Sequence, residues 1–95
     1  MSRNLSSQRV TVPEQVMMRE VGGEAVILNV DTEQYFGLDE VGARMWVALT
    51  STDSVQQALG ILLEEYDVES DRLASDMQAF IDQLAVEGLL EVHEA

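Results

Sequence analysis

Three apolar runs, separated by short turns, occupy the first part of the chain. Residues 16–21 and 24–30 are rich in aliphatic side chains and residues 34–38 form a shorter aromatic run, so each segment is predicted as a β-strand. Gly22 and Gly23 supply the positive φ angles of a two-residue hairpin turn, and the polar residues 31–33 make a second turn. The pattern therefore predicts an antiparallel meander of three strands.

From residue 40 onward, apolar positions recur at the spacing of amphipathic helices. Asp39 and Ser70 are predicted to cap the first and third helices, because their side chains accept hydrogen bonds from the free N–H groups of a first turn. Asp53 and Ser54 are both candidate caps of the second helix, and Gly88 is expected to end the third. Strands followed by helices predict an α+β fold. The predicted apolar stripes are Val41, Met45, Trp46 and Leu49 in the first helix, Val55, Ala58, Leu59, Leu62, Leu63 and Tyr66 in the second, and Leu73, Met77, Phe80, Ile81 and Leu84 in the third.

The two ends of the chain carry less pattern. Residues 1–11 are polar with no apolar face, which predicts a flexible tail ahead of one ordered domain over residues 12–95. Residues 89–92, Leu-Leu-Glu-Val, are compatible either with a short terminal strand or with an extended segment packed on the domain.

The net charge of −13, from 18 acidic and 5 basic residues, narrows the range of partners. The negative electrostatic field of such a protein repels nucleic-acid phosphates and anionic membranes and attracts cationic molecules. Neither nucleic acid nor a membrane is therefore an expected partner. Two interpretations of the acidity remain, a solubility device or a match to a basic ligand. The sequence has neither the apolar core of a signal peptide nor an apolar run of the roughly 20 residues that a membrane span needs, which predicts a cytoplasmic protein.

Candidate catalytic and metal-binding groups are sparse. The chain has no cysteine, which excludes disulfides and thiolate metal sites. His93 is the single histidine and is predicted to be a solvated tail residue, since a catalytic base needs partners held at fixed geometry. Adjacent carboxylates such as Glu64 and Glu65 lack the spacing of a calcium loop. We therefore expect no enzyme activity, no metal and no cofactor, and we assign Trp46 to the core.

The third predicted strand lies at the edge of the meander. Between Tyr35 and Leu38 there is neither a charge nor a proline, the usual devices that keep an edge from pairing with another chain, and Gly37 permits close backbone approach. This edge is either covered by the C-terminal segment or open to a peptide strand. If the start of the third helix lies beside it, Leu73 and Met77 make the apolar floor of a groove bordered by Arg72 and Asp76; otherwise both are ordinary core.

Several short motifs then follow one another along the chain. Residues 35–39 (YFGLD) precede Gly42 and Trp46, a second helix ends in Tyr66, and residues 76–81 (DMQAFI) and 88–90 (GLL) close the series. Together, over roughly residues 12–92, they resemble the family named for pyrroloquinoline-quinone biosynthesis protein D. The resemblance implies a winged helix-turn-helix-like fold, with the three-stranded antiparallel sheet ahead of three helices.

Members of that family are recognition elements for ribosomally made, post-translationally modified peptides. The resemblance implies that the leader region of a precursor peptide adds as an antiparallel strand to the third strand, packs against the third helix and is presented to a modifying enzyme. The residues predicted to bind the peptide are Val30, Asp31, Gln34, Tyr35, Phe36, Gly37, Leu38, Arg72, Leu73, Asp76, Met77 and Phe80.

Residues 35–42 (YFGLDEVG) look most like the stand-alone leader-binding proteins of lasso-peptide clusters. This resemblance implies a leader peptidase as the partner enzyme. One alternative is a recognition chaperone for a radical S-adenosylmethionine enzyme, as in quinone-cofactor biosynthesis. Another is a protein-interaction or DNA-binding winged-helix module, although the third helix offers only Arg72 for phosphate contacts.

Overall fold

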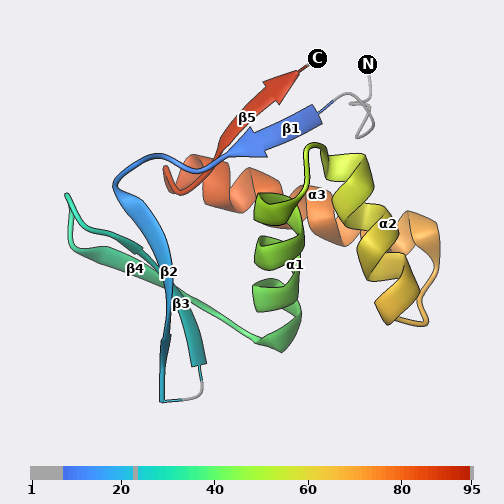
Figure 1. The fold of residues 1–95 in the computed structure, drawn as a ribbon, viewed down its shortest axis with the longest axis horizontal. Coiled ribbons are helices and arrows are strands. Elements are labelled where there is room, and N and C mark those ends of the chain that lie inside the picture. The colour runs from blue at the N-terminus through green and yellow to red at the C-terminus, as the bar shows by residue number, and fades with distance from the viewer. Residues whose placement is uncertain (1–7, 23, 95) are drawn as a thin grey trace.

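The computed structural model describes residues 8–22 and 24–94 and has the predicted α+β architecture. Figure 1 shows the sheet at one end of the molecule and α2 at the other, with α1 between them and α3 running from α2 toward the sheet. In chain order the elements are β1 (Gln8–Thr11), β2 (Val16–Val21), β3 (Glu24–Asn29), β4 (Gln34–Leu38), α1 (Glu40–Ser51), α2 (Val55–Glu65), α3 (Ser70–Val86) and β5 (Glu91–Glu94).

The predicted meander is confirmed as a three-stranded antiparallel sheet in the order β2-β3-β4. Val21 pairs with Glu24 beside the tight turn, where Gly22 has a φ of 61°. The register then runs through Ile27, which pairs with both Met18 and Phe36. Because side chains alternate between the two faces of a sheet, these three residues share one face, and all three belong to or pack against a buried cluster under the helices.

A second pair of strands joins the two ends of the described chain. β1 and β5 are antiparallel, with Val10 opposite Val92, and the pair lies apart from the meander (Figure 1). The segment Gln8–Thr11 is therefore a strand and not part of the flexible tail that its polar composition predicted; residues 1–7 of that expected tail lie outside the described residues. Of the two interpretations of the C-terminal segment, the short strand is the one observed, and its partner is β1 instead of the β4 edge.

The helix boundaries follow local capping chemistry. The Asp39 carboxylate accepts a 2.7 Å hydrogen bond from the N–H of Gly42 at the start of α1, and Ser54, not Asp53, caps α2. The prediction for α3 was off by one residue: its N-cap is Glu69, which makes no side-chain capping bond, and Ser70 is the first helical residue.

Two buried clusters form the core. Trp46 belongs to the cluster between the meander and the helices, which confirms its assignment to the core, whereas Val41 remains 44% exposed although it was expected on the buried stripe. The sheet cluster contains Val16, Ile27, Leu38, Trp46, Leu84, Leu89 and Leu90. The helix cluster contains Met45, Ala48, Leu49, Val55, Ala58, Leu62, Leu73, Met77 and Ile81, with Val10 and Val92 of the β1–β5 pair packed against it.

An ion pair ties α1 to α2 at the surface. The Arg44 guanidinium donates to both carboxylate oxygens of Glu65, through Nε at 3.1 Å and through Nη2. The hydrogen bond from Arg44 lowers the pKa of the Glu65 carboxyl, and the same bond raises the pKa of Arg44. None of the helices in residues 8–22 and 24–94 is both long and apolar enough to cross a membrane.

Candidate peptide-binding edge

The free edge of β4 carries unpaired backbone groups. Val30, just after β3, donates its N–H to the chain ahead of β2 over 2.9 Å, and backbone direction alternates along a strand. Ile27, an odd number of residues away, therefore directs its N–H and C=O toward its partner Phe36 in β4. On β4 the intervening residues Tyr35 and Gly37 direct theirs away from β3, and no described strand pairs with them.

The side chains of β4 alternate in the same way. Phe36 and Leu38 face the helices and contribute to the core, whereas Tyr35 is 74% exposed on the opposite face. A Cβ at Gly37 would meet nothing within 4 Å, so no internal contact requires glycine there. An edge with two outward N–H and C=O pairs and no obstructing charge is the kind of surface to which an extended peptide adds.

The turn that leads into β4 is held by a buried side chain. Asn29 is 9% exposed, and its Oδ1 accepts hydrogen bonds from the N–H groups of Asp31 and Thr32 at 3.0 and 3.2 Å. The turn places Glu33 at a φ of 61°, a left-handed conformation that residues other than glycine, asparagine and aspartate seldom adopt. Val30 and Asp31, both predicted to contact a peptide, are exposed in this turn.

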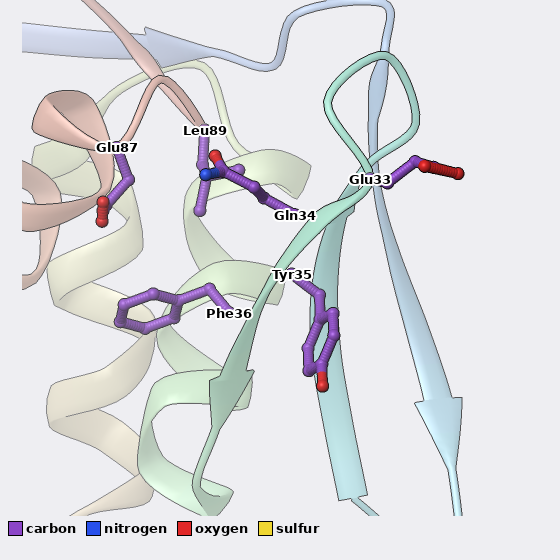
Figure 2. Close-up of a pocket in the computed structure, with 6 residues that line it drawn as sticks. All are labelled: Glu33, Gln34, Tyr35, Phe36, Glu87 and Leu89. Carbon is purple, nitrogen blue, oxygen red and sulfur yellow. The ribbon is translucent and has the colours of Figure 1, made fainter.

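A pocket of about 320 Å³ lies beside β4. Figure 2 shows the Phe36 ring and the Gln34 amide on the side of β4 that faces Glu87 and Leu89, while the side chains of Tyr35 and Glu33 point away from that space. The pocket joins the strand edge to the end of α3. Its lining residues are Glu33, Gln34, Tyr35, Phe36, Glu87 and Leu89.

The far wall of the pocket is the C-terminal end of α3. Gly88 has a φ of 76° and donates its N–H to Ala85 O over 3.1 Å, and Leu89 N–H donates to Leu84 O over 2.8 Å. These bonds form a Schellman motif and confirm Gly88 as the residue after the helix cap. The motif turns the chain so that Leu89 is buried while Glu87 borders the pocket.

The predicted groove at the start of α3 is not where the pocket lies. Of the two interpretations of Leu73 and Met77, core is the one observed: they are 5% and 0% exposed inside the helix cluster. Arg72 and Asp76 are exposed near the start of α3, the end that lies beside α2 in Figure 1. Phe80, halfway along α3, is partly buried and packs against both clusters.

Sequence reasoning missed three pocket residues, Glu33, Glu87 and Leu89. Gly88 signalled where α3 ends, but the sequence carries no signal that this end faces β4, because the direction of α3 depends on packing between distant segments. Gln34, Tyr35 and Phe36 are the predicted residues that do line the pocket.

Catalytic groups do not gather in this region. His93 is half-buried in β5, and its Nε2 lies 2.9 Å from the Thr11 hydroxyl across the strand pair, so it is not the solvated tail residue that was predicted. Within residues 8–22 and 24–94 no group of three or more histidine, aspartate or glutamate side chains is placed to hold a metal ion. The edge and the pocket are suited to binding.

Comparisons with known proteins find a matching family and similar solved structures. The profile described as coenzyme PQQ synthesis protein D (PqqD) matches residues 24–90. The solved structure of TbiB1 in complex with the TbiA(beta) leader peptide is 31% identical, with a TM-score of 0.76 over 84% of this chain and 93% of that one. Lasso peptide synthetase B1 complexed with the leader peptide has the same fold at 19% identity, with a TM-score of 0.78 over 87% of this chain and 98% of that one. Comparison with curated proteins gives no match.

Proposed function

Because the chain belongs to the PqqD family, a family of non-catalytic peptide-recognition domains, we propose that it binds the leader region of a ribosomally made precursor peptide. The observation that carries the proposal is the open edge of β4 beside a pocket. TbiB1, at 31% identity, was solved with a leader peptide, which supports the same class of ligand here.

The peptide would bind by strand addition. Tyr35 and Gly37 present two N–H and C=O pairs, so an extended peptide can continue the sheet as a fourth strand outside β4. Of the twelve residues predicted to contact the peptide, those of β4 and the turn before it retain this role in the proposal. Arg72 and Asp76 would contact only a peptide long enough to reach the start of α3, and Leu73 and Met77 would act through the core.

The partner enzyme that we propose is a leader peptidase of a lasso-peptide pathway. The likeness of residues 35–42 (YFGLDEVG) to the stand-alone leader-binding proteins of lasso-peptide clusters supports this branch over a radical S-adenosylmethionine enzyme. DNA binding is disfavoured by the net charge of −13, since a duplex needs cationic side chains against its phosphates.

Gly37→Pro tests strand addition. Proline removes an outward N–H, which edge strands tolerate, whereas Gly37→Ala keeps the N–H and meets no neighbour within 4 Å. A phage-displayed library of random 16-residue peptides is first selected on the parent protein, and the best binder is synthesised with a fluorescein label. Its Kd by fluorescence anisotropy should rise about threefold to tenfold with proline, from the roughly 0.5–1.5 kcal/mol of one hydrogen bond, and change little with alanine.

Circular dichroism checks that both variants keep the parent fold. A version of the peptide N-methylated at alternate amides should lose affinity in the same way, because its own donors are then missing. Failure of the library to yield any binder, or equal affinity of the parent and Gly37→Pro for the selected peptide, would contradict the proposed function.

A further inference from the structure

The pocket beside β4 has the chemistry of a cation site. We propose that it accepts the positively charged side chain of a lysine or arginine in the bound peptide, with Glu87 as the charge partner; this inference rests on the proposed function. Of the residues that line it, Glu87, Gln34 and Phe36 bring a carboxylate, an amide and an aromatic ring to the space between β4 and α3, while the side chains of Glu33 and Tyr35 point away. No cationic side chain lines it.

Glu87 lies at the C-terminal end of α3, where a negative charge is unfavourable. The C-terminal end of a helix carries a partial negative charge, so a carboxylate there is unfavourable and a cation is favourable. The last turn of α3 nevertheless contains no basic residue, and the Glu87 carboxylate makes no hydrogen bond or ion pair with any residue that the structure describes. The helix end and the carboxylate therefore both contribute negative charge at the wall of the pocket that Glu87 lines.

The other walls suit the stem and head of a long basic side chain. The Phe36 side chain lines the pocket, and aromatic rings attract ammonium and guanidinium groups. Leu89 is 4% exposed and offers an apolar contact for methylene groups. The Gln34 amide, which makes no side-chain hydrogen bond within the described residues, has an oxygen that can accept from the head group.

Strand register places a peptide side chain at this pocket. If the peptide pairs with the outward groups of Tyr35 and Gly37, the peptide residue opposite Phe36 has its side chain on the same face as Phe36, toward α3. Its neighbours on either side point to the face that carries Tyr35. The proposal therefore predicts a basic preference at one position of the peptide, in addition to the general attraction of an acidic protein for cations.

The experiment distinguishes the effect of the charge at residue 87 from the effect of the net charge of the protein. The phage-displayed 16-residue library is selected in parallel on the parent, on Glu87→Lys and on Glu64→Lys, a control that makes the same charge change on the exposed face of α2. Glu87→Lys is expected to fold, because a cation suits the end of a helix. The parent and Glu64→Lys should both enrich lysine or arginine at one aligned position, and Glu87→Lys should enrich aspartate or glutamate there.

Affinities then test the pairing directly. The fluorescein-labelled binder from the parent selection should bind Glu87→Lys about tenfold or more weakly and Glu64→Lys less than about threefold more weakly, since a distant exposed charge is screened. Changing its basic residue to glutamate should reverse the order of the parent and Glu87→Lys.

Enrichment of lysine or arginine at the same aligned position in the Glu87→Lys and parent selections would overturn the assignment of the pocket as a cation site. Equal losses of affinity in Glu87→Lys and Glu64→Lys would overturn it as well. These outcomes leave the proposed function standing as long as Gly37→Pro still weakens the same peptide. Indifference of that peptide to Gly37→Pro would instead overturn strand addition itself.

Discussion

Single residues at the junction of β4 and α1 show how closely this region is packed. A Cβ at Gly42 would lie 3.2 Å from Asp39 Oδ1, 3.4 Å from Leu38 Cδ2 and 3.5 Å from Phe80 Cε1. The absence of a side chain at Gly42 therefore lets α1 start directly after the strand while Phe80 of α3 packs over the joint. The open edge is in this way held against two helices, and its position depends in part on Gly42, which is not among the residues proposed to contact the peptide.

Met77 gives a residue-scale prediction about the core. Its side chain is 0% exposed among apolar neighbours, so Met77→Ala removes buried contacts and leaves a cavity. We expect the free energy of unfolding to fall by about 2–5 kcal/mol, measured by urea denaturation. Val86→Ala, at a position of the same helix that is 87% exposed, is the control and should change it by less than about 0.5 kcal/mol.

A Met77→Ala variant as stable as the parent would show that the helix cluster is looser than its burial indicates. Because Leu73 and Met77 are both buried, substituting either of them by aspartate is not a useful test of peptide binding. A charge placed there would unfold the domain before it could report on peptide binding, because it would be buried without a partner.

At the scale of elements, α1 and α2 are linked by packing and by the Arg44–Glu65 ion pair. Arg44→Gln removes the pair and should lower the Tm at pH 7. The pKa of Glu65 is lowered in the folded protein, so the pair stabilises the fold above the ordinary glutamate pKa of about 4.3. That stabilisation is lost as the pH falls through the lowered pKa.

The Tm difference between the parent and Arg44→Gln should accordingly shrink toward zero on acidification from pH 5 to pH 2, followed by circular dichroism. Arg19→Gln is the control, because Arg19 is exposed and makes no ion pair within the described residues. A difference that persists unchanged at the lowest pH would mean that Arg44 stabilises the protein through its stem and not through Glu65.

The elements that could be predicted from the sequence are those whose signals are local. The cap at Asp39 and the helix stop at Gly88 each depend on a few neighbouring residues and were predicted, and Ser54 was one of the two candidate caps of α2. The β1–β5 pair was not, since the polar residues of β1 become a strand only when β5 meets them. The direction of α3 is also set by distant packing, which is why the open edge of β4 could be predicted from the sequence, whereas the pocket beside it, at the end of α3, could not.

At the scale of the whole molecule, the net charge of −13 acts on any partner before contact. The association rate with a basic peptide should fall as salt rises, because screening shortens the field from about 30 Å at 0.01 M to about 8 Å at 0.15 M salt. The dissociation rate should change less, since strand pairing is short-range. Stopped-flow fluorescence with the labelled binder measures both rates.

A titration with duplex DNA belongs beside that measurement, and no binding is expected at moderate salt. An association rate that is indifferent to salt would leave solubility as the role of the acidity. Tight DNA binding would overturn the functional assignment as a whole.

The β1–β5 pair has a consequence for the order in which the molecule opens. Thr11 and His93 are hydrogen-bonded across the pair although they are 82 residues apart in the sequence. The strands of the meander, in contrast, pair with strands that are close to them in the sequence. Each strand of the pair has only four residues, and the pair lies apart from the three-stranded sheet, so few contacts hold it in place. The pair should therefore form last and fray first, as a separate unit of low stability. Native-state hydrogen exchange would show this as faster exchange of the β1 and β5 amides than of those in β3 and α3, and equal protection would mean that the ends of the chain unfold only with the whole domain.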